Sequence, residues 1–228
     1  ICACLVGSEM CIRDRYLPFR ERSEELIRID CDHLEEALQT GASGALTASG
    51  TMAVCRRLDI PMAITCGMGG IGDLRGEELC PDLPALMNIP VALISTSPKD
   101  MLDRPATLDW LRRHGVHTAG EPCTGYLFCG EPVALELPLS SCNNEAAVRR
   151  LTANGGLLLL NPIPEKERVQ DRSILVDAIK AGKQAEAEGH YYHPAANGEI
   201  DRRTDGYSSR IQLESIQQNY LLAKSIMD

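Results

Sequence analysis

Lys99 is the residue whose type and position point most directly to chemistry. It follows an apolar run from Pro90 to Thr96 that has the character of a buried strand, and then Ser97 and Pro98, which suit the N-cap and the first position of a helix. A cation in the first turn of a helix faces the positive end of the helix dipole and costs about 0.3–1 kcal/mol. Positive potential and burial both lower the pKa of an ammonium group. Lys99 is therefore a candidate nucleophilic amine, with a solvated surface lysine as the alternative.

A glycine-rich segment, Cys66 to Gly72, offers a second kind of chemistry. Four of its seven residues are glycine, which opens backbone conformations closed to other residues and leaves amide N–H groups that can face an anion. The pattern is not the GxGxxG of dinucleotide-binding proteins, and no acidic residue follows a second strand at the expected distance. An anion site and a purely structural loop both stay open.

The elements that must position these residues alternate along the chain. Short apolar runs at 61–65, 90–96 and 156–160 suit buried strands. Helices are expected over residues 47–58, over a stretch that ends at 112–115, over residues 173–188 and over residues 211–227. This order predicts a three-layer α/β/α sandwich around a mostly parallel or mixed sheet.

The expected sheet would bring the candidate functional residues together at one of its edges. In open α/β sheets ligands bind beyond the carboxyl ends of the strands, so Thr65, the glycine segment, Thr96 and Lys99 could converge on one crevice. The segment from Asn161 to Glu165 contains two prolines, which hold the backbone extended and stiff.

Composition and net charge narrow the class of molecule that this protein could bind. The chain has 228 residues, 44% of them hydrophobic, with a net charge of -9, which argues against a nucleic-acid polymer or an anionic membrane and favours a small, mobile substrate. No run approaches the roughly 18 apolar residues of a membrane span, and no secretory leader is visible. The ten cysteines are scattered without CxxC pairs or zinc spacing. We therefore expect a cytoplasmic protein with free thiols.

The first fifteen residues stand apart. The stretch from Val6 to Arg15 resembles a translated sequencing adapter, so residues 1–15 are set aside as a non-native segment. We expect the natural chain to enter at about Tyr16, and residues 16–228 to form a single α/β domain that lacks its N-terminal part.

The chain also carries a series of short motifs in a recognisable order. They are Gly44-Ala-Leu-Thr47, Thr51-Met52, Thr65 with the glycine segment, Arg75-Gly76, Asp82-Leu83, Lys99-Asp100-Met-Leu-Asp103 and Asn161-Pro-Ile-Pro-Glu165. This order and spacing resemble those of the pseudouridine-5'-phosphate glycosidases, the family also called indigoidine synthase A-like. The resemblance covers about Arg28 to the C-terminus, and the last two motifs are its most specific part.

The resemblance implies a reaction and a set of residues. Members of that family reversibly cleave the C–C glycosidic bond of pseudouridine 5'-phosphate to uracil and ribose 5-phosphate. They capture C1 of the opened ribose as an imine on a lysine, while a carboxylate and a divalent metal, usually manganese, manage protons. Lys99 matches the catalytic lysine, and the family's general-acid glutamate falls in the part expected to be missing. The substrate-binding residues implied are Arg28, Thr47, Ala48, Thr65, Cys80, Pro81, Asp82 and Asn219.

Several positions depart from the family pattern. The metal-binding aspartate of the family aligns with Glu78, or with Glu77 if the alignment gap in this shorter segment is placed differently. The resemblance implies Mn²⁺ as the cofactor. Arg28 replaces a lysine and keeps its charge, and Cys80 replaces a serine that touches substrate. Leu74 replaces a histidine. An amide on a helix face such as Asn219 is more often structural than a ligand.

These departures leave alternative functions open. Cys80 and Leu74 favour a lysine-imine lyase that acts on a different sugar phosphate. A catalytically silent sugar-phosphate-binding homologue is a second alternative, against which Lys99 and Glu78 argue. The resemblance implies a homo-oligomer, a trimer, and a small sugar phosphate or nucleotide as partner. His193-Pro194 stands where the family has Thr-Pro, which favours a turn there.

Overall fold

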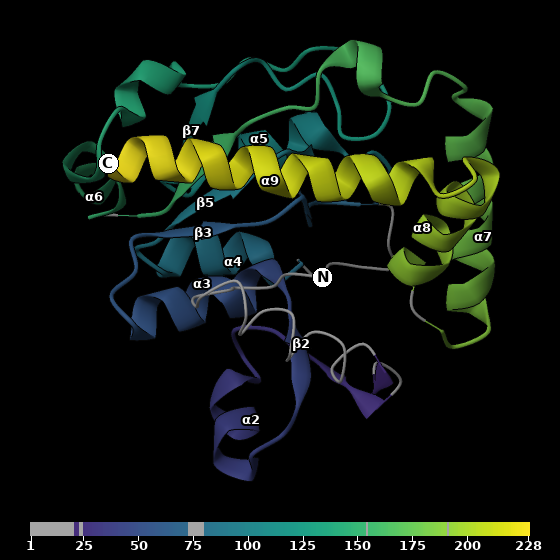
Figure 1. The fold of residues 1–228 in the computed structure, drawn as a ribbon, viewed down its shortest axis with the longest axis horizontal. Helices are drawn as coiled ribbons and strands as arrows, with labels where there is room; N and C mark the ends of the chain where they lie inside the picture. Colours follow the sequence, from purple (N-terminus) through teal and green to yellow (C-terminus); the bar gives the residue numbers. More distant parts are fainter. Residues whose placement is uncertain (1–20, 23–24, 73–79, 154, 191) are drawn as a thin grey trace.

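The computed structural model describes residues 21–22, 25–72, 80–153, 155–190 and 192–228 (Figure 1). Its main sheet has four parallel strands in the order β3-β5-β8-β7. They are β3 (Met62–Ile64), β5 (Ala92–Ser95), β7 (His117–Gly120) and β8 (Leu157–Leu160). Every pairing between neighbouring strands is parallel, as expected when helices form the crossover connections.

Helices cover both faces of this sheet. The first face packs against α3 (Ala48–Arg57), α4 (Asp82–Asn88) and α5 (Arg104–Arg113), and the second against α6 (Glu145–Thr152) and α9 (Tyr207–Met227). In Figure 1, α9 runs across the front of the strands. The predicted three-layer α/β/α sandwich with a parallel sheet is therefore confirmed.

Strands β3, β5 and β8 are mostly apolar because both of their faces are largely buried. In β8, Leu158 and Leu160 point into the core formed with α3 to α5, while Leu157 and Leu159 point into the core formed with α6 and α9. All four side chains are at most 1% exposed. The alternation of side chains along the strand thus divides one apolar run between two cores.

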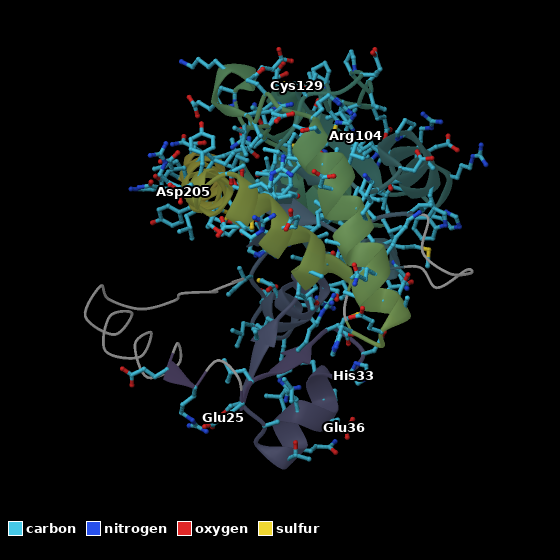
Figure 2. All side chains as sticks on the ribbon, turned by 90° about the vertical axis from the view of Figure 1, so that its right-hand side faces the viewer. Glu25, His33, Glu36, Arg104, Cys129 and Asp205 are labelled. Atoms are coloured by element: carbon cyan, nitrogen blue, oxygen red, sulfur yellow. The ribbon has the colours of Figure 1, made fainter. Side chains whose placement is uncertain are left out.

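A small module precedes the sheet. It consists of β1 (Ile27–Ile29), α2 (Leu34–Thr40) and β2 (Gly44–Leu46), with β1 and β2 paired in parallel. Its own apolar cluster includes Ile29, Leu34 and Ala37 and reaches Ala53 and Val54 of α3. Figure 2 shows Glu25, His33 and Glu36 on this module, far from Arg104 and Cys129.

A second lobe is built around α7 (Ser173–Ala187) and α8 (Tyr192–Arg203), which lie side by side near the start of α9 (Figure 1). Its apolar cluster joins residues of these helices to the loop residues Tyr126 to Phe128 and to Ile163 and Val169. Short 3-10 turns, η2 (Leu139–Cys142) and η3 (Glu165–Glu167), complete the chain.

Two short strands form a separate two-stranded sheet. β4 (Gly67–Met68) pairs in parallel with β6 (Ser97–Pro98) just beyond the ends of β3 and β5. The segment before Lys99 is therefore extended, and the expected helix start at Ser97 and Pro98 is wrong. Helix α5 begins at Arg104, where the Asp103 carboxylate accepts the Ala106 N–H at 2.9 Å and Pro105 occupies the first turn. The N-cap is thus Asp103, six residues after Ser97, and this aspartate was the sequence signal for the true start of the helix.

The other expected elements are found with shifted ends. The expected helices at 47–58 and 173–188 correspond to α3 and α7, and the helix predicted to end at 112–115 is α5. The last helix begins at Tyr207 rather than Ile211, after Gly206 with a φ of 77°. The turn expected at His193-Pro194 is wrong, because both residues lie in the first turn of α8, where a proline needs no intrahelical N–H partner. No helix within the described residues is long and apolar enough to span a bilayer.

Candidate active site

Lys99 lies directly after β6, at the carboxyl end of the parallel sheet. Its backbone N–H donates to the Met68 carbonyl at 3.1 Å, and its own carbonyl accepts from the Leu102 N–H. The stem of Lys99 and the ring of Tyr126 both lie against the backbone of Gly67, where an added Cβ would stand 3.2 Å from the Lys99 Cγ and 2.8 Å from the Tyr126 Cε1. Close packing therefore holds the lysine stem in place.

The surroundings of Lys99 set its protonation. Burial of the side chain is the main cause that lowers the pKa of its amine, and the Arg28 guanidinium lowers it further. Asp82 opposes this shift, as do the thiols of Cys80 and Cys66. The sequence predicts a lowered pKa from burial and from a helix dipole. Burial is the main physical cause in the structure, whereas the helix dipole is not a cause, because Lys99 is in no helix.

Asp82 is buried at the start of α4 and holds two other segments. Its Oδ1 accepts the Ser49 N–H at 3.0 Å, and its Oδ2 accepts the Gly69 N–H at 2.8 Å. It therefore joins the N-termini of α3 and α4 to the glycine segment. Pro81, at the N-cap position of α4, makes no side-chain capping bond.

Cys80 is a protonated thiol at neutral pH. Burial and the neighbouring Asp82 carboxylate raise its pKa to about 12, although Lys99 and Arg28 both favour the thiolate. Such a group is a weak hydrogen-bond partner and not a nucleophile.

Close packing, rather than unusual backbone angles, explains why the glycine segment contains its glycines. None of its glycines has a positive φ. An added Cβ would stand 2.0 Å from the Cys80 Sγ at Gly69 and 2.6 Å from the Thr107 Oγ1 at Gly70. The expectation that its amides are free to face an anion is wrong at two of them, because Gly69 donates to Asp82 and Ile71 donates to the Thr107 hydroxyl at 2.9 Å.

The remaining predicted residues surround the start of α3. Thr47 is the N-cap of α3: its hydroxyl accepts the Gly50 N–H at 3.2 Å and contacts the Ser49 hydroxyl at 2.9 Å. Ala48 is the first residue of the helix and is buried. Arg28 is an exposed residue of β1 whose charge acts on both Lys99 and Cys80.

Asn219 and Thr65 meet in a buried network at the ends of the strands. The Asn219 Nδ2 donates to the Thr65 carbonyl at 2.7 Å and lies 3.4 Å from the Thr96 Oγ1, while its Oδ1 accepts from the Asn161 Nδ2 at 2.9 Å. Asn219 is fully buried. Its partners in the structure are protein groups, and its contact with substrate stays a prediction.

Asp100 is a site-shaping residue that sequence reasoning did not single out. Its carboxylate accepts three consecutive backbone N–H groups, from Tyr126 at 2.8 Å, Leu127 at 2.6 Å and Phe128 at 3.1 Å. Burial nevertheless raises the pKa of this carboxyl. Gly125, with a φ of 125°, makes the turn that aims these amides at one point. A partner 26 residues away leaves no signal in local sequence.

His193 is a second residue that the sequence argument missed. The charges of Lys99 and Arg28 act on its imidazole, and together with burial, the main cause, they lower its pKa to about 4. Its Nδ1 is buried and has no hydrogen-bond partner among the described residues. The only signal in the sequence was a histidine at a position where the resemblance expected threonine.

The implied metal cannot be placed with the described residues alone. Glu78 and Glu77, the predicted ligands, lie outside them, as do Leu74 and Arg75-Gly76. The described residues contain no group of three His, Cys, Asp or Glu side chains arranged to bind a metal. Both oxygens of Asp82 already accept backbone N–H groups. These residues therefore do not form a metal site by themselves.

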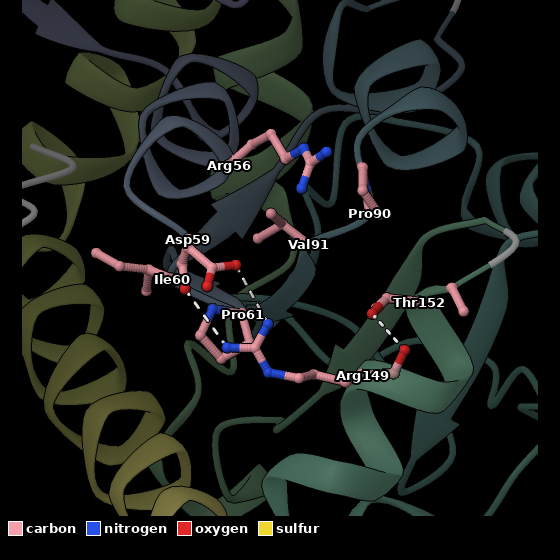
Figure 3. Close-up of a pocket in the computed structure, with 9 residues that line it drawn as sticks. Arg56, Asp59, Ile60, Pro61, Pro90, Val91, Arg149 and Thr152 are labelled. Atoms are coloured by element: carbon pink, nitrogen blue, oxygen red, sulfur yellow. Dashed lines mark hydrogen bonds and ion pairs between the residues drawn. The ribbon is translucent and has the colours of Figure 1, made fainter.

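Two surface pockets lie away from Lys99. One, of about 170 Å³, is lined by Arg56, Asp59 and Arg149 together with Pro61 and Pro90, which precede β3 and β5 (Figure 3). The other, of about 420 Å³, lies between the segment 161–164 and α9. The first is at the amino edge of the sheet, opposite to the edge where α/β proteins bind ligands, and the second is not lined by Lys99. The buried amine of Lys99, rather than the volume of a pocket, therefore identifies the candidate site.

The fold and this lysine define a parallel α/β/α protein with a buried amine at the carboxyl edge of its sheet. A family model described as "Indigoidine synthase A like protein" matches residues 17–227. The chain belongs to this family.

The curated relatives described here share the name pseudouridine-5'-phosphate glycosidase. A pseudouridine-5'-phosphate glycosidase of Methylobacterium nodulans is 28% identical over 218 residues, covering 90% of this chain and 64% of the relative. Another, of Streptomyces griseus subsp. griseus, is 30% identical and covers 85% of this chain and 64% of the relative. The chain thus spans a little under two thirds of the length of these relatives.

Two solved structures share the fold. The prealnumycin C-glycosynthase AlnA in complex with ribulose 5-phosphate has a TM-score of 0.74 and 23% identity, with 93% of this chain and 76% of that chain covered. An indigoidine synthase A-like protein of Thermotoga maritima has a TM-score of 0.73 and 20% identity, with 93% and 73% covered. At these identities the likeness shows the fold.

Proposed function

We propose that this protein reversibly cleaves the C–C glycosidic bond of pseudouridine 5'-phosphate, giving uracil and ribose 5-phosphate, through an imine on Lys99. The observation that carries the proposal is the placement of Lys99: a largely buried amine of lowered pKa at the carboxyl edge of the sheet. The family membership and the names of the curated relatives support the same reaction. No other described lysine combines burial with this position, since Lys166, Lys180, Lys183 and Lys224 are exposed or lie on the outer helices.

The burial of Lys99 fits the needs of imine chemistry. Only the neutral amine carries an electron pair that can bond to ribose C1, and desolvation increases the neutral fraction. In cleavage, the Lys99 Nζ forms a bond to ribose C1 while the bond from C1 to the ring oxygen breaks and that oxygen takes up a proton. The bond between C1 and uracil C5 then breaks as the Nζ electron pair forms the C=N bond, and C5 keeps the electron pair of the broken bond and takes up a proton. The sugar remains bound to the Lys99 Nζ as an imine. One water then hydrolyses the imine and releases the aldehyde and the free amine.

Residues around Lys99 have supporting parts in this proposal. Arg28 offers a guanidinium to the phosphate group. Asp82, fixed by two backbone amides, opposes the lowering of the Lys99 pKa and holds α3, α4 and the glycine segment in register. The protonated Cys80 thiol occupies the place of the family's serine and contacts the base or the sugar without reacting.

A second candidate is a lysine-imine enzyme that acts on another sugar phosphate. The observation that favours it is Cys80, whose weakly polar, protonated thiol replaces a hydroxyl that is a stronger hydrogen-bond partner. Substrate choice separates the two candidates: the first releases uracil from pseudouridine 5'-phosphate, and the second does not.

Reductive trapping tests the shared imine. The protein is incubated with ribose 5-phosphate and sodium borohydride, and peptide mass mapping locates the adduct. We expect a stable adduct on Lys99 that is absent in Lys99→Ala and unchanged in Lys180→Ala, an exposed lysine paired with Asp177. An adduct on another lysine, or one that persists in Lys99→Ala, contradicts the proposal.

A further inference from the structure

A phosphate dianion bound near Arg28 needs several hydrogen-bond donors, and two amides of the glycine segment expected to serve it are committed elsewhere. The amides of Gly69 and Ile71 donate to side chains of the protein. The Thr47 hydroxyl oxygen accepts the Gly50 N–H, and the same hydroxyl contacts the Ser49 hydroxyl at 2.9 Å. Another donor near Arg28 would therefore strengthen the binding of a phosphate there.

His193 is placed to be that donor. It lies in the first turn of α8, next to Tyr192, whose ring meets the imidazole edge-on with centroids 5.4 Å apart. Tyr192 belongs to the same apolar cluster as Tyr126, and Cys66 packs against that cluster. Because the Tyr126 ring and the Lys99 stem share the surface of Gly67, this cluster forms the lobe that faces Lys99. Its packing fixes the backbone that carries His193.

The imidazole has unused hydrogen-bonding capacity. The His193 Nδ1 is buried, and no described residue is its partner. A buried polar atom without a partner costs free energy unless a ligand or water satisfies it. Such an atom beside two cations indicates a place for an anionic or hydroxylated ligand.

The charges around His193 favour an anion in particular. The charged groups that act on the imidazole are Lys99, after β6, and Arg28, in β1. With burial they lower its pKa to about 4, so the free protein holds it neutral at pH 7. Asp82, Cys80 and Cys66 oppose the lowering of the Lys99 pKa. An incoming dianion offsets the two cations and strengthens an N–H···O bond from the imidazole.

We propose that His193 binds the phosphate end of the sugar-phosphate substrate, together with Arg28. The identity of the sugar rests on the proposed function, whereas the phosphate contact does not require an imine. The neutral ring donates one N–H to a phosphate oxygen, and the bound dianion then favours protonation of the other nitrogen.

Ribitol 5-phosphate tests this contact separately from imine chemistry, because it carries the phosphate but has no aldehyde. Isothermal titration is performed with wild-type protein, His193→Leu, His193→Asn and the control His190→Leu, which removes an exposed histidine outside the site. We expect about tenfold weaker binding in His193→Leu, partial recovery in His193→Asn, whose amide lies near the position of Nδ1, and no change in His190→Leu.

The histidine signals provide a second readout that does not depend on the stability of any variant. With ¹³C-labelled histidine, the Cε1 resonance that is missing in His193→Asn should shift on addition of ribitol 5-phosphate and stay in place on addition of ribitol. Equal affinity of wild type and His193→Leu, or an unmoved resonance, overturns the inference. Equal weakening of ribitol binding overturns it too, since the contact would then be to the sugar chain. A missing Lys99 adduct alongside His193-dependent phosphate binding would remove the proposed reaction and leave this contact standing.

Discussion

The Asp100 carboxylate accepts the Tyr126 N–H at 2.8 Å, so the residue next to Lys99 positions the tyrosine whose ring packs beside the lysine stem. The Tyr126 hydroxyl in turn donates to the Gln212 Oε1 at 3.0 Å in α9. One carboxylate thereby links the Lys99 segment, the loop over it and the last helix. This linkage has measurable consequences for stability.

Asp100→Asn should destabilise the protein by about 3 kcal/mol, because the asparagine NH₂ faces amides that need an acceptor. Urea unfolding measures the change. Asp103→Asn is the matched control: asparagine caps a helix as well as aspartate does, so we expect a loss below about 1 kcal/mol. Equal losses in the two variants contradict a special role for Asp100.

Gly69→Ala should be destabilising because the new Cβ would meet the Cys80 Sγ at 2.0 Å. Overpacking of this kind costs roughly 1–3 kcal/mol. Removing the sulfur in Cys80→Ala should restore part of that loss, so the double variant is more stable than the sum of the single changes predicts. Strictly additive free energies of unfolding would show that the two residues do not meet.

Asn219→Leu should cost about 2–4 kcal/mol, because it leaves the Thr65 carbonyl and the Asn161 amide buried without their partner. Gln217→Leu, on the exposed face of the same helix, should change stability by less than about 0.5 kcal/mol. Thermal and urea unfolding compare the two. A mild effect of Asn219→Leu would mean that water replaces the amide in this network.

His193 should make stability depend on pH in the acid range. Its pKa falls from 6.5 to about 4 on folding, so between these values the unfolded chain binds more protons, and the free energy of unfolding decreases as the pH falls. The loss attributable to His193 approaches roughly 3 kcal/mol at most. The difference in unfolding free energy between His193→Leu and wild type should change by that order between pH 7 and pH 4. A difference independent of pH would contradict a neutral, buried imidazole.

We propose that Glu78 binds a divalent cation, Mn²⁺ by resemblance to the family, since carboxylate oxygen is the ligand that hard cations prefer. Titration calorimetry with MnCl₂ should show saturable binding that Glu78→Ala weakens at least about tenfold. Glu77→Ala, one residue away, is the comparison and should bind as the wild type does. A reversed order assigns the ligand to Glu77, and identical isotherms in all three proteins place the metal elsewhere.

Local patterns in the sequence were sufficient for much of the fold. The apolar runs at 61–65, 90–96 and 156–160 became β3, β5 and β8, because a strand buried on both faces is apolar at most of its positions. Thr47 as the N-cap of α3 and Gly115 after α5, with a φ of 76°, also followed from residue type. These signals act over a few residues, which is why they are readable without a structure.

Competition between local signals was harder to resolve. Ser97 and Pro98 form a plausible helix start, and so do Asp103 and Pro105. The pairing of β6 with β4, which lies 30 residues earlier in the chain, keeps Ser97 extended and leaves Asp103 to cap α5. Of the two predicted causes of the lowered pKa of Lys99, burial therefore applies and the helix dipole does not.

The sequence by itself determined the three-layer class of the fold, the lysine at the carboxyl edge of the sheet and the family to which the motifs belong, because these are written in residue type, order and short spacing. Only the tertiary structure decided which amides of the glycine segment already donate hydrogen bonds within the protein. It also decided that Asn219 links the ends of three strands, and that Asp100 and His193 belong to the surroundings of Lys99. These facts depend on contacts between residues 26 to 154 positions apart and on desolvation, which no single stretch of sequence contains.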